Sequence, residues 1–298
     1  MYNRFFNEIK NREKIITNTD LDGILSASLL CKCFPHLELS GFSNSSTNIW
    51  FKKDVTKENS LYIDIFMTNK NTFCIDNHII NTCDYPIESN LKINPNLLRN
   101  ITLDKYTKKY PFSTFIFILN ILENYMEINF IDLEKIIGYV NDEPLYLWEL
   151  ILRADDTLLN SFRYKNNTNE WWDYLISDNS IMLKKLKEKV KDVNSISKAM
   201  YIKEKVQKFL LDNFNIKTDG FKYINNSNFN KFVTFVSESL GCKLLIPNDL
   251  NNIEVKLYRH DFSNEDIFDL NKIFEKYNII SLSFVSRFML SFSFLEKS

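Results

Sequence analysis

Short apolar runs alternate with stretches of helical spacing through the first half of the chain. Residues 14–17 are β-branched and mostly apolar, which predicts a buried strand. From Ile24 apolar residues recur at helical spacing as far as Phe34, and Pro35 predicts the end of that helix. Similar apolar runs predict further strands at 37–40, 61–65, 72–75 and 91–93. Alternating strands and helices are typical of an α/β domain with a mostly parallel sheet.

Helical spacing dominates the middle of the chain, and short strands return after it. Helices are predicted at 112–126, 132–139 and 143–154, and the Lys-, Leu- and Glu-rich stretch at 181–213 predicts one or two more. Beyond that stretch, strands are predicted at 221–224, 242–246 and 254–258, helices at 230–240 and 264–277, and a pair of antiparallel strands within 279–294.

These elements predict an α/β fold in three parts. Residues 1–168 are expected to form a mostly parallel sheet flanked by helices. Residues 169–217 are expected to form a helical linker, and residues 218–298 a smaller C-terminal α/β domain. At 298 residues the chain is long enough for two ordinary domains with cores of their own.

Composition narrows the class of protein. The formal net charge of −1 gives no overall positive field that would attract long nucleic acid, although it leaves room for a local basic groove. No apolar run reaches the length of a membrane span, so no membrane partner is expected. Five cysteines at irregular spacing favour reduced thiols, which predicts a cytoplasmic protein. Cys31 and Cys33 are two residues apart on a predicted helix and are expected to be structural.

Acidic residues follow several of the predicted strands. Asp20 and Asp22 come directly after the first strand and precede Gly23, and Asp64 and Asp76 end two later strands. Because ligands bind at the carboxyl ends of parallel strands, we expect these carboxylates to converge and hold metal ions. Each residue also has an ordinary interpretation, since Asp22 is suited to cap a helix and Asp64 to close an Asx turn.

An imidazole accompanies the last of these acids. His78 lies two residues after Asp76, and imidazole nitrogen is a ligand for Mn²⁺ and similar cations. By itself such a histidine is more often a turn residue than a ligand. The arrangement as a whole, with acid after acid at one edge of one sheet, favours the metal site.

The set of motifs resembles the DHH phosphoesterase superfamily, which includes RecJ-type exonucleases, small oligoribonucleases and exopolyphosphatases. The segment from Asp20 to Ser26 is similar to the first motif, Asp64 to the second, and Asp76-Asn77-His78 to the signature with its middle residue changed. Asn94 begins an Asn-Pro turn similar to the one that often follows the signature, and the resemblance makes it a candidate to contact the substrate.

The acid of the fourth motif has two candidate positions. Asp142, which follows a predicted helix, is our first choice, and Asp155 with Asp156 is the competing one. The resemblance covers the first half of the chain in detail and the second half only in layout.

The resemblance implies two Mn²⁺ or Mg²⁺ ions that activate water for hydrolysis of a phosphodiester or phosphoanhydride bond. It implies Asp22 and Asp64 as shared ligands, Asp20 on one ion, and His78 with Asp142 on the other. Asp76 is implied either as a ligand or as a residue that orients one. The implied catalytic residues are those of the signature, Asp76, Asn77 and His78.

Two asparagines depart from the family pattern. Asn18 stands where many members carry His or Asp, and Asn77 replaces the first histidine of the signature. Since asparagine is a neutral and poorer ligand, these changes are expected to lower activity or alter the choice of substrate.

The C-terminal part departs further. It lacks the Gly-Gly-His segment of the family, which leaves Arg259, His260 and Arg287 as candidates to contact a phosphate or a base. Trp171 and Trp172 are able to stack on bases, but packing is the commoner role of such residues.

The function expected from these residues is metal-dependent hydrolysis of short oligonucleotides or small nucleotides. A compact chain without overall positive charge suits a short substrate better than a long strand. One alternative is a RecJ-like exonuclease on single-stranded DNA. The other is a nucleotide- or partner-binding protein of the same fold whose chemistry is weakened by Asn18 and Asn77.

Overall fold

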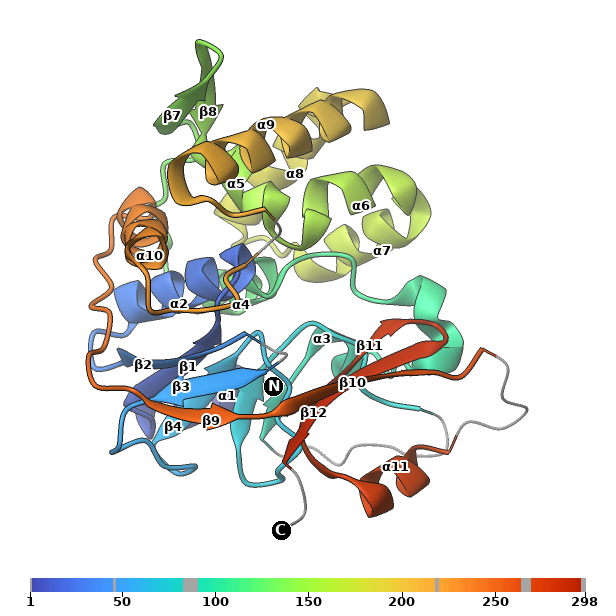
Figure 1. Cartoon of the computed structure of the whole chain (residues 1–298). Helices are drawn as coiled ribbons and strands as arrows, with labels where there is room; N and C mark the ends of the chain where they lie inside the picture. Colours follow the sequence, from blue (N-terminus) through green and yellow to red (C-terminus); the bar gives the residue numbers. More distant parts are fainter. Residues whose placement is uncertain (1, 45–46, 83–90, 218–219, 264–268, 296–298) are drawn as a thin grey trace. The chain divides into compact units, whose positions relative to one another are not determined.

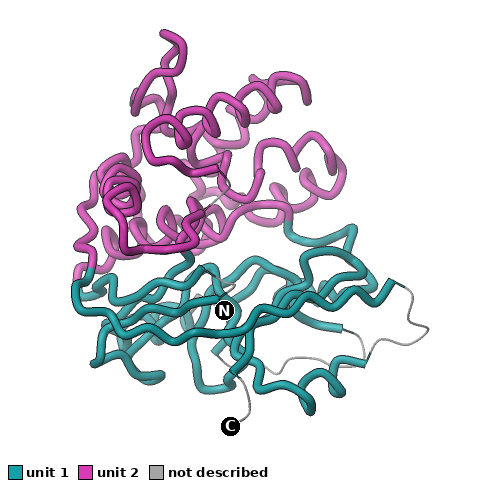
Figure 2. Tube along the Cα trace, viewed as in Figure 1, with its two compact units in different colours: residues 1–18, 36–110, 247–298 teal, residues 19–35, 111–246 magenta. Residues whose placement is uncertain are grey.

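The structure, a computed structural model, describes residues 2–44, 47–82, 91–217, 220–263 and 269–295. The chain forms two compact units (Figure 2). Unit 1 contains residues 1–18, 36–110 and 247–298, and unit 2 contains residues 19–35 and 111–246. Each unit is therefore built from segments that are far apart in the sequence.

A mostly parallel sheet of seven strands forms the centre of unit 1 (Figure 1). The strands at its middle are parallel to each other, whereas β3 and β9 are added antiparallel at one edge. In spatial order the strands are β6 (Lys92–Ile93), β5 (Phe73–Ile75), β4 (Ser60–Ile63), β1 (Lys14–Asn18), β2 (Glu38–Ser43), β3 (Asn48–Phe51) and β9 (Asn251–Glu254).

The burial of the central strands explains why they carry so few polar residues. Ile15 and Ile16 of β1 have no exposed surface, and Leu61 of β4 and Phe73 of β5 have none either. Strands that are covered on both faces are apolar without alternation, which is the pattern that predicts a parallel sheet. The α/β fold class with a mostly parallel main sheet is therefore confirmed.

A smaller antiparallel sheet near the C-terminus completes unit 1. The strand order is β10 (Lys256–Asp261), β12 (Met289–Leu295) and β11 (Asn278–Ser286). The antiparallel pair predicted within 279–294 is thus present as β11 and β12. The other elements of this unit are α1 (Tyr2–Lys10), α3 (Pro95–Leu98), the 3-10 helix η1 (Leu103–Lys108) and α11 (Leu270–Lys276).

Unit 2 is mainly helical. The stretch predicted to hold one or two helices at 181–213 forms two, α8 and α9. Within the described ranges, no helix combines the length and apolar character needed to cross a bilayer. The elements of the unit are α2 (Leu21–Cys33), α4 (Thr114–Glu123), β7 (Ile136–Val140), β8 (Glu143–Tyr146), α5 (Leu147–Arg153), the 3-10 helix η2 (Ala154–Asp156), α6 (Thr157–Arg163), α7 (Lys165–Leu175), α8 (Ile181–Val193), α9 (Ile196–Phe214) and α10 (Ser227–Ser239).

The helix predicted at 132–139 is wrong. Residues 136–146 form the antiparallel hairpin β7–β8 instead. Its turn places Asn141 and Asp142 at positive φ angles of 50° and 67°. Two consecutive residues in this conformation form the tight turn that suits the twist of a hairpin, and Asn and Asp adopt it more readily than most residues. The turn overrides the helical spacing of the apolar residues before it.

The strands predicted at 221–224 and 242–246 are also absent from the described chain. Phe221 packs its ring against Phe229 and Phe232 of α10, and Ile224 is buried, so these two apolar residues find packing partners without forming a strand. Of the predicted helix at 264–277, residues 270–276 form α11, and residues 264–268 lie outside the described ranges, as does Cys83.

Candidate metal centre

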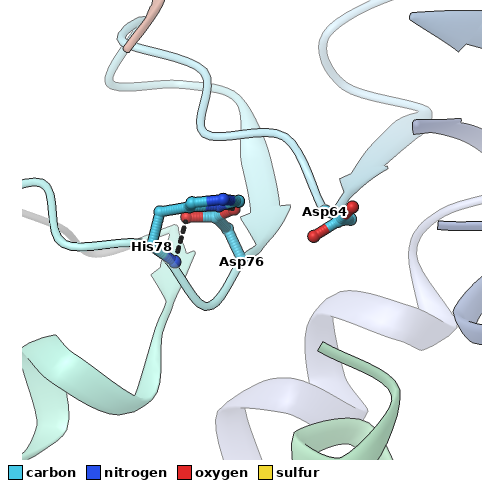
Figure 3. A group of neighbouring side chains, drawn as sticks. All are labelled: Asp64, Asp76 and His78. Carbon is cyan, nitrogen blue, oxygen red and sulfur yellow. Dashed lines mark hydrogen bonds and ion pairs between the residues drawn. The ribbon is translucent and has the colours of Figure 1, made fainter. Parts of the chain in front are cut away.

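Three of the predicted metal-site residues lie together in unit 1. Asp64 follows β4, and Asp76 follows β5, which pairs with β4 in parallel, so both acids lie at the same edge of the sheet. Asp64, Asp76 and His78 each offer a ligand atom, and these atoms all lie within 4.8 Å of one another (Figure 3). Of the four carboxylates expected to converge, Asp64 and Asp76 therefore lie together within this unit, with His78 beside them.

Asp76 holds His78 in place through two contacts. The Nδ1 of the His78 ring lies 2.8 Å from Asp76 Oδ1, and the His78 backbone N–H donates to Asp76 Oδ2 at 3.0 Å (Figure 3). Asp76 is 1% exposed, whereas the His78 side chain is 38% exposed. A carboxylate that accepts from Nδ1 leaves Nε2 as the ring nitrogen able to bind a metal.

Asn94, which directly follows β6, donates hydrogen bonds to both Asp76 and His78. Its Nδ2 donates to Asp76 Oδ2 at 3.2 Å and to the His78 carbonyl at 2.8 Å. Its Oδ1 accepts from the Asn96 backbone N–H at 2.8 Å and caps the short helix α3. Asn94 was predicted to bind substrate, and the structure shows it 1% exposed, with these hydrogen bonds to the protein.

Asn77, the variant residue of the signature, lies between Asp76 and His78 in the sequence. It is 7% exposed, and its backbone carbonyl accepts from Asn96 Nδ2 at 2.7 Å. The backbone of Asn77 is therefore held by the same Asn-Pro turn that holds Asp76 and His78.

The backbone of Asp64 adopts an unusual, left-handed conformation. Its φ angle is 59°, a left-handed value that Asp and Asn adopt more readily than most side chains. Its N–H donates to the Ile75 carbonyl at 2.8 Å, which ties it to β5. Its Oδ2 accepts from Asn18 Nδ2 at 3.2 Å. A histidine or aspartate at position 18 would meet Asp64 differently, so the Asn18 departure bears directly on this site.

Strand β11 supports the loops that carry the cluster. Thr68 in the loop after Asp64 donates from both its N–H and its Oγ1 to the Ile280 carbonyl, at 2.8 and 3.1 Å. Next to His78, the Ile79 carbonyl accepts from the Phe284 N–H at 2.9 Å. Sequence reasoning missed these supports, because the partners are about 200 residues apart in the chain and no local pattern links them.

Unit 2 contains the acids of the first motif. Asp20 is the N-cap of α2, and its Oδ1 accepts from the Gly23 N–H at 2.9 Å. The helix cap considered for Asp22 is thus made by Asp20. Gly220 lies against Asp20, because a Cβ at Gly220 would stand 2.9 Å from the Asp20 Cβ.

Asp22 is buried and bound to the start of another helix. Its two carboxylate oxygens accept from the backbone N–H groups of Thr114 and Phe115, at 2.7 and 2.9 Å, in the first turn of α4. Burial raises the pKa of Asp22 well above its usual value, the nearby charges of Asp155 and Asp20 raise it further, and the two amides oppose the shift.

The candidates for the fourth acid differ sharply in their surroundings. Asp142 lies in the exposed turn of the β7–β8 hairpin. Asp155 acts electrostatically on Asp22 and so belongs to its surroundings. Asp156 forms ion pairs with Arg153 and Lys203. Within unit 2 the surroundings favour Asp155, one of the two competing choices, over Asp142.

The predicted substrate residues of the C-terminal part lie on the small sheet. Arg259 and His260 are neighbours in β10 and therefore point to opposite faces of it. His260 stacks between Tyr258 and Phe262, with ring centroids 6.2 and 6.3 Å away. Arg287 lies in the turn between β11 and β12 and is exposed.

The two tryptophans considered as a stacking platform are core residues. Trp171 is fully buried and Trp172 is 1% exposed. The Trp172 ring lies 4.3 Å from that of Phe112, measured between centroids. Packing is also the commoner role expected for such residues from the sequence.

The donor set of the cluster in unit 1 suits a divalent cation. It combines the buried carboxylate of Asp64 with the imidazole of His78, which the buried Asp76 carboxylate orients, and this mixture of oxygen and nitrogen donors fits Mn²⁺ and its neighbours better than Ca²⁺. No family model, curated protein or solved structure matches the chain.

Proposed function

We propose that this chain is a divalent-metal-dependent phosphodiesterase that hydrolyses short oligonucleotides or small nucleotides. The observation that carries the proposal is the cluster of Asp64, Asp76 and His78, whose ligand atoms lie within 4.8 Å of one another at the carboxyl edge of a parallel sheet. This edge is where such sheets place their ligands.

Each residue of the cluster takes a role in the proposal. Asp64 and His78 hold the ion, and Asp76 keeps the His78 ring in the orientation that presents Nε2. A bound Mn²⁺ or Mg²⁺ would lower the pKa of a coordinated water molecule and would neutralise the charge that develops on the phosphoryl oxygens. Asp20 and Asp22 remain predicted ligands, and the second ion remains a prediction, on the resemblance to DHH enzymes alone.

Asp64 offers the sharpest test, because the chain provides a matched control. Asp64 and Asp249 both have positive φ angles, of 59° and 55°, and Asn tolerates that conformation whereas Ala does not. Asp64→Asn therefore removes the charge without adding backbone strain, and Asp249→Asn makes the same change at an exposed position of the same unit.

The assay incubates the protein and both variants with Mn²⁺ and a panel of dinucleotides, short RNA, short DNA and cyclic dinucleotides. We expect turnover by the unmodified chain and by Asp249→Asn. We expect Asp64→Asn to lose more than about 100-fold, since even residues that only support metal ligands are worth about 10–100-fold. Equal turnover by Asp64→Asn and the unmodified chain on every substrate would refute the proposal, and so would the absence of turnover in all three.

A further inference from the structure

Two segments far apart in the sequence are attached to the residues that directly follow His78. The Leu103 N–H at the start of η1 donates to the Asn81 carbonyl at 3.0 Å. The Phe284 N–H of β11 donates to the Ile79 carbonyl at 2.9 Å. Both segments belong to unit 1, as the cluster does. Both segments are therefore hydrogen-bonded to the chain within three residues of His78.

The two segments are also joined to each other. The Tyr106 hydroxyl of η1 donates to the Val285 carbonyl at the end of β11, at 3.1 Å. Lys109 Nζ lies 3.1 Å from the same hydroxyl and 4.7 Å from the centroid of the Tyr106 ring. We call the surface formed by these two segments the basic ledge, which comprises Lys105, Tyr106, Lys108, Lys109, Arg287 and Phe288.

The ledge is positive although the chain is not. The chain has a formal net charge of −1, yet residues 103–109 and 285–289 contain Lys105, Lys108, Lys109 and Arg287 against the single acid Asp104. Lys105, Lys108 and Arg287 are exposed. Local positive charge of this kind attracts the phosphates of a nucleic acid in a salt-dependent way.

Aromatic rings are interleaved with these cations. The Arg287 guanidinium lies 5.4 Å from the centroid of the Phe288 ring, and Phe288 is 48% exposed. Tyr106 carries Lys109 above its ring in the same way. Proteins that bind single strands combine cations that follow the backbone with rings on which bases stack.

We propose that the basic ledge binds the phosphates and bases of a single-stranded oligonucleotide whose reacting end reaches the Asp64–Asp76–His78 cluster. This inference rests on the proposed function and specifies its substrate: a strand of several nucleotides, held beyond the bond that is cut. Both segments of the ledge are hydrogen-bonded to Ile79 or Asn81, within three residues of His78, which supports a strand that spans the ledge and the cluster.

The test measures binding without hydrolysis. A fluorescein-labelled 12-nucleotide single strand and a labelled dinucleotide are titrated with the protein in EDTA, at several salt concentrations, and anisotropy is recorded. Lys105→Glu/Arg287→Glu is compared with Lys198→Glu, a charge reversal at an exposed position of unit 2. Lys105→Gln/Arg287→Gln removes the same two charges more gently, and thermal melts confirm that each variant folds.

We expect the unmodified chain to bind the 12-mer at least about tenfold more tightly than the dinucleotide. The Lys105→Gln/Arg287→Gln pair should reduce the slope of log K against log salt by about 1.4, from about 0.7 for each lost phosphate contact. The Glu pair should lose most of the preference for the 12-mer, and Lys198→Glu should keep it.

The inference is overturned if the 12-mer and the dinucleotide bind equally, or if Lys105→Glu/Arg287→Glu binds the 12-mer as Lys198→Glu does. Displacement of the 12-mer by inorganic polyphosphate of similar charge as efficiently as by unlabelled 12-mer would overturn the assignment to nucleic acid. Because EDTA removes the metal, this outcome is independent of turnover, so failure of the ledge and failure of the hydrolase proposal are distinguishable.

Discussion

The imidazole of His78 is held by the carboxylate of Asp76, with Nδ1 and Oδ1 2.8 Å apart and Asp76 almost fully buried. Asp76 Oδ2 also accepts from the His78 backbone N–H and from Asn94 Nδ2, so one carboxylate organises the whole turn. This relationship makes a partly exposed histidine suited to metal binding, because the ring would meet a bound metal in a fixed orientation.

Asp76→Asn is expected to weaken Mn²⁺ binding by about 10–100-fold, the usual effect of losing a residue that orients a metal ligand. The amide offers only one accepting oxygen where the carboxylate offers two. Isothermal titration with Mn²⁺ measures the affinity, and ¹⁵N NMR of the His78 ring reports its tautomer. An unchanged affinity together with an unchanged tautomer would show that Asp76 has no orienting role.

Asp155→Asn is expected to lower Mn²⁺-dependent turnover by about tenfold or more, and Asp142→Asn to lower it less. Asp155 acts on the buried Asp22, whereas Asp142 lies in an exposed hairpin turn. The two variants form a matched pair, because both residues have positive φ angles, of 50° and 67°, that Asn accepts. A larger loss in Asp142→Asn would restore Asp142 as the acid of the fourth motif.

Gly220→Ala is expected to destabilise the protein by about 1–3 kcal/mol, the usual cost of an added methyl group in a space that cannot hold it. The new Cβ would stand 2.9 Å from the Asp20 Cβ and 3.0 Å from its Cα, and backbone cannot move aside as a side-chain end can. Urea denaturation measures the change. Gly241→Asn serves as control, since that site is open and its φ of 67° suits Asn; equal midpoints for the two variants would contradict the steric argument.

The stability of the protein is expected to depend on pH through Glu123. Its carboxylate accepts from the backbone N–H groups of Met182 and Leu183, and burial raises its pKa above the usual 4.5. Ionisation is therefore harder in the folded chain than in the unfolded one. The contribution to stability is complete below pH 4.5 and is lost as the pH rises through the raised pKa.

Denaturation of the unmodified chain and of Glu123→Gln between about pH 4 and 7 checks this sign. The free energy of unfolding of the unmodified chain, minus that of the variant, should fall as the pH rises. Glu127→Gln, the same substitution at an exposed position of the same region, serves as the control. A difference that stays flat or rises with pH would contradict the prediction.

Local patterns in the sequence determined the central strands and the place of their acids. Apolar runs predict β1, β4, β5 and β6, since a strand buried on both faces has few polar positions to vary. The carboxyl ends of parallel strands meet at one edge, so the positions of Asp64 and Asp76 along the chain were enough to predict their proximity. The same reasoning failed at 132–139, where the Asn141–Asp142 turn, itself visible in the sequence, outweighs the helical spacing.

Only the tertiary structure decided which distant segments support the site. Strand β9, about 200 residues after β3, joins the main sheet as its edge, and β11 holds the loops after Asp64 and His78. Backbone hydrogen bonds of this kind can form with almost any sequence, so the residue types do not predict which distant segments will pair. The sequence by itself therefore determined which side chains are able to bind a metal, and the long-range pairing of backbone groups determined how firmly they are held.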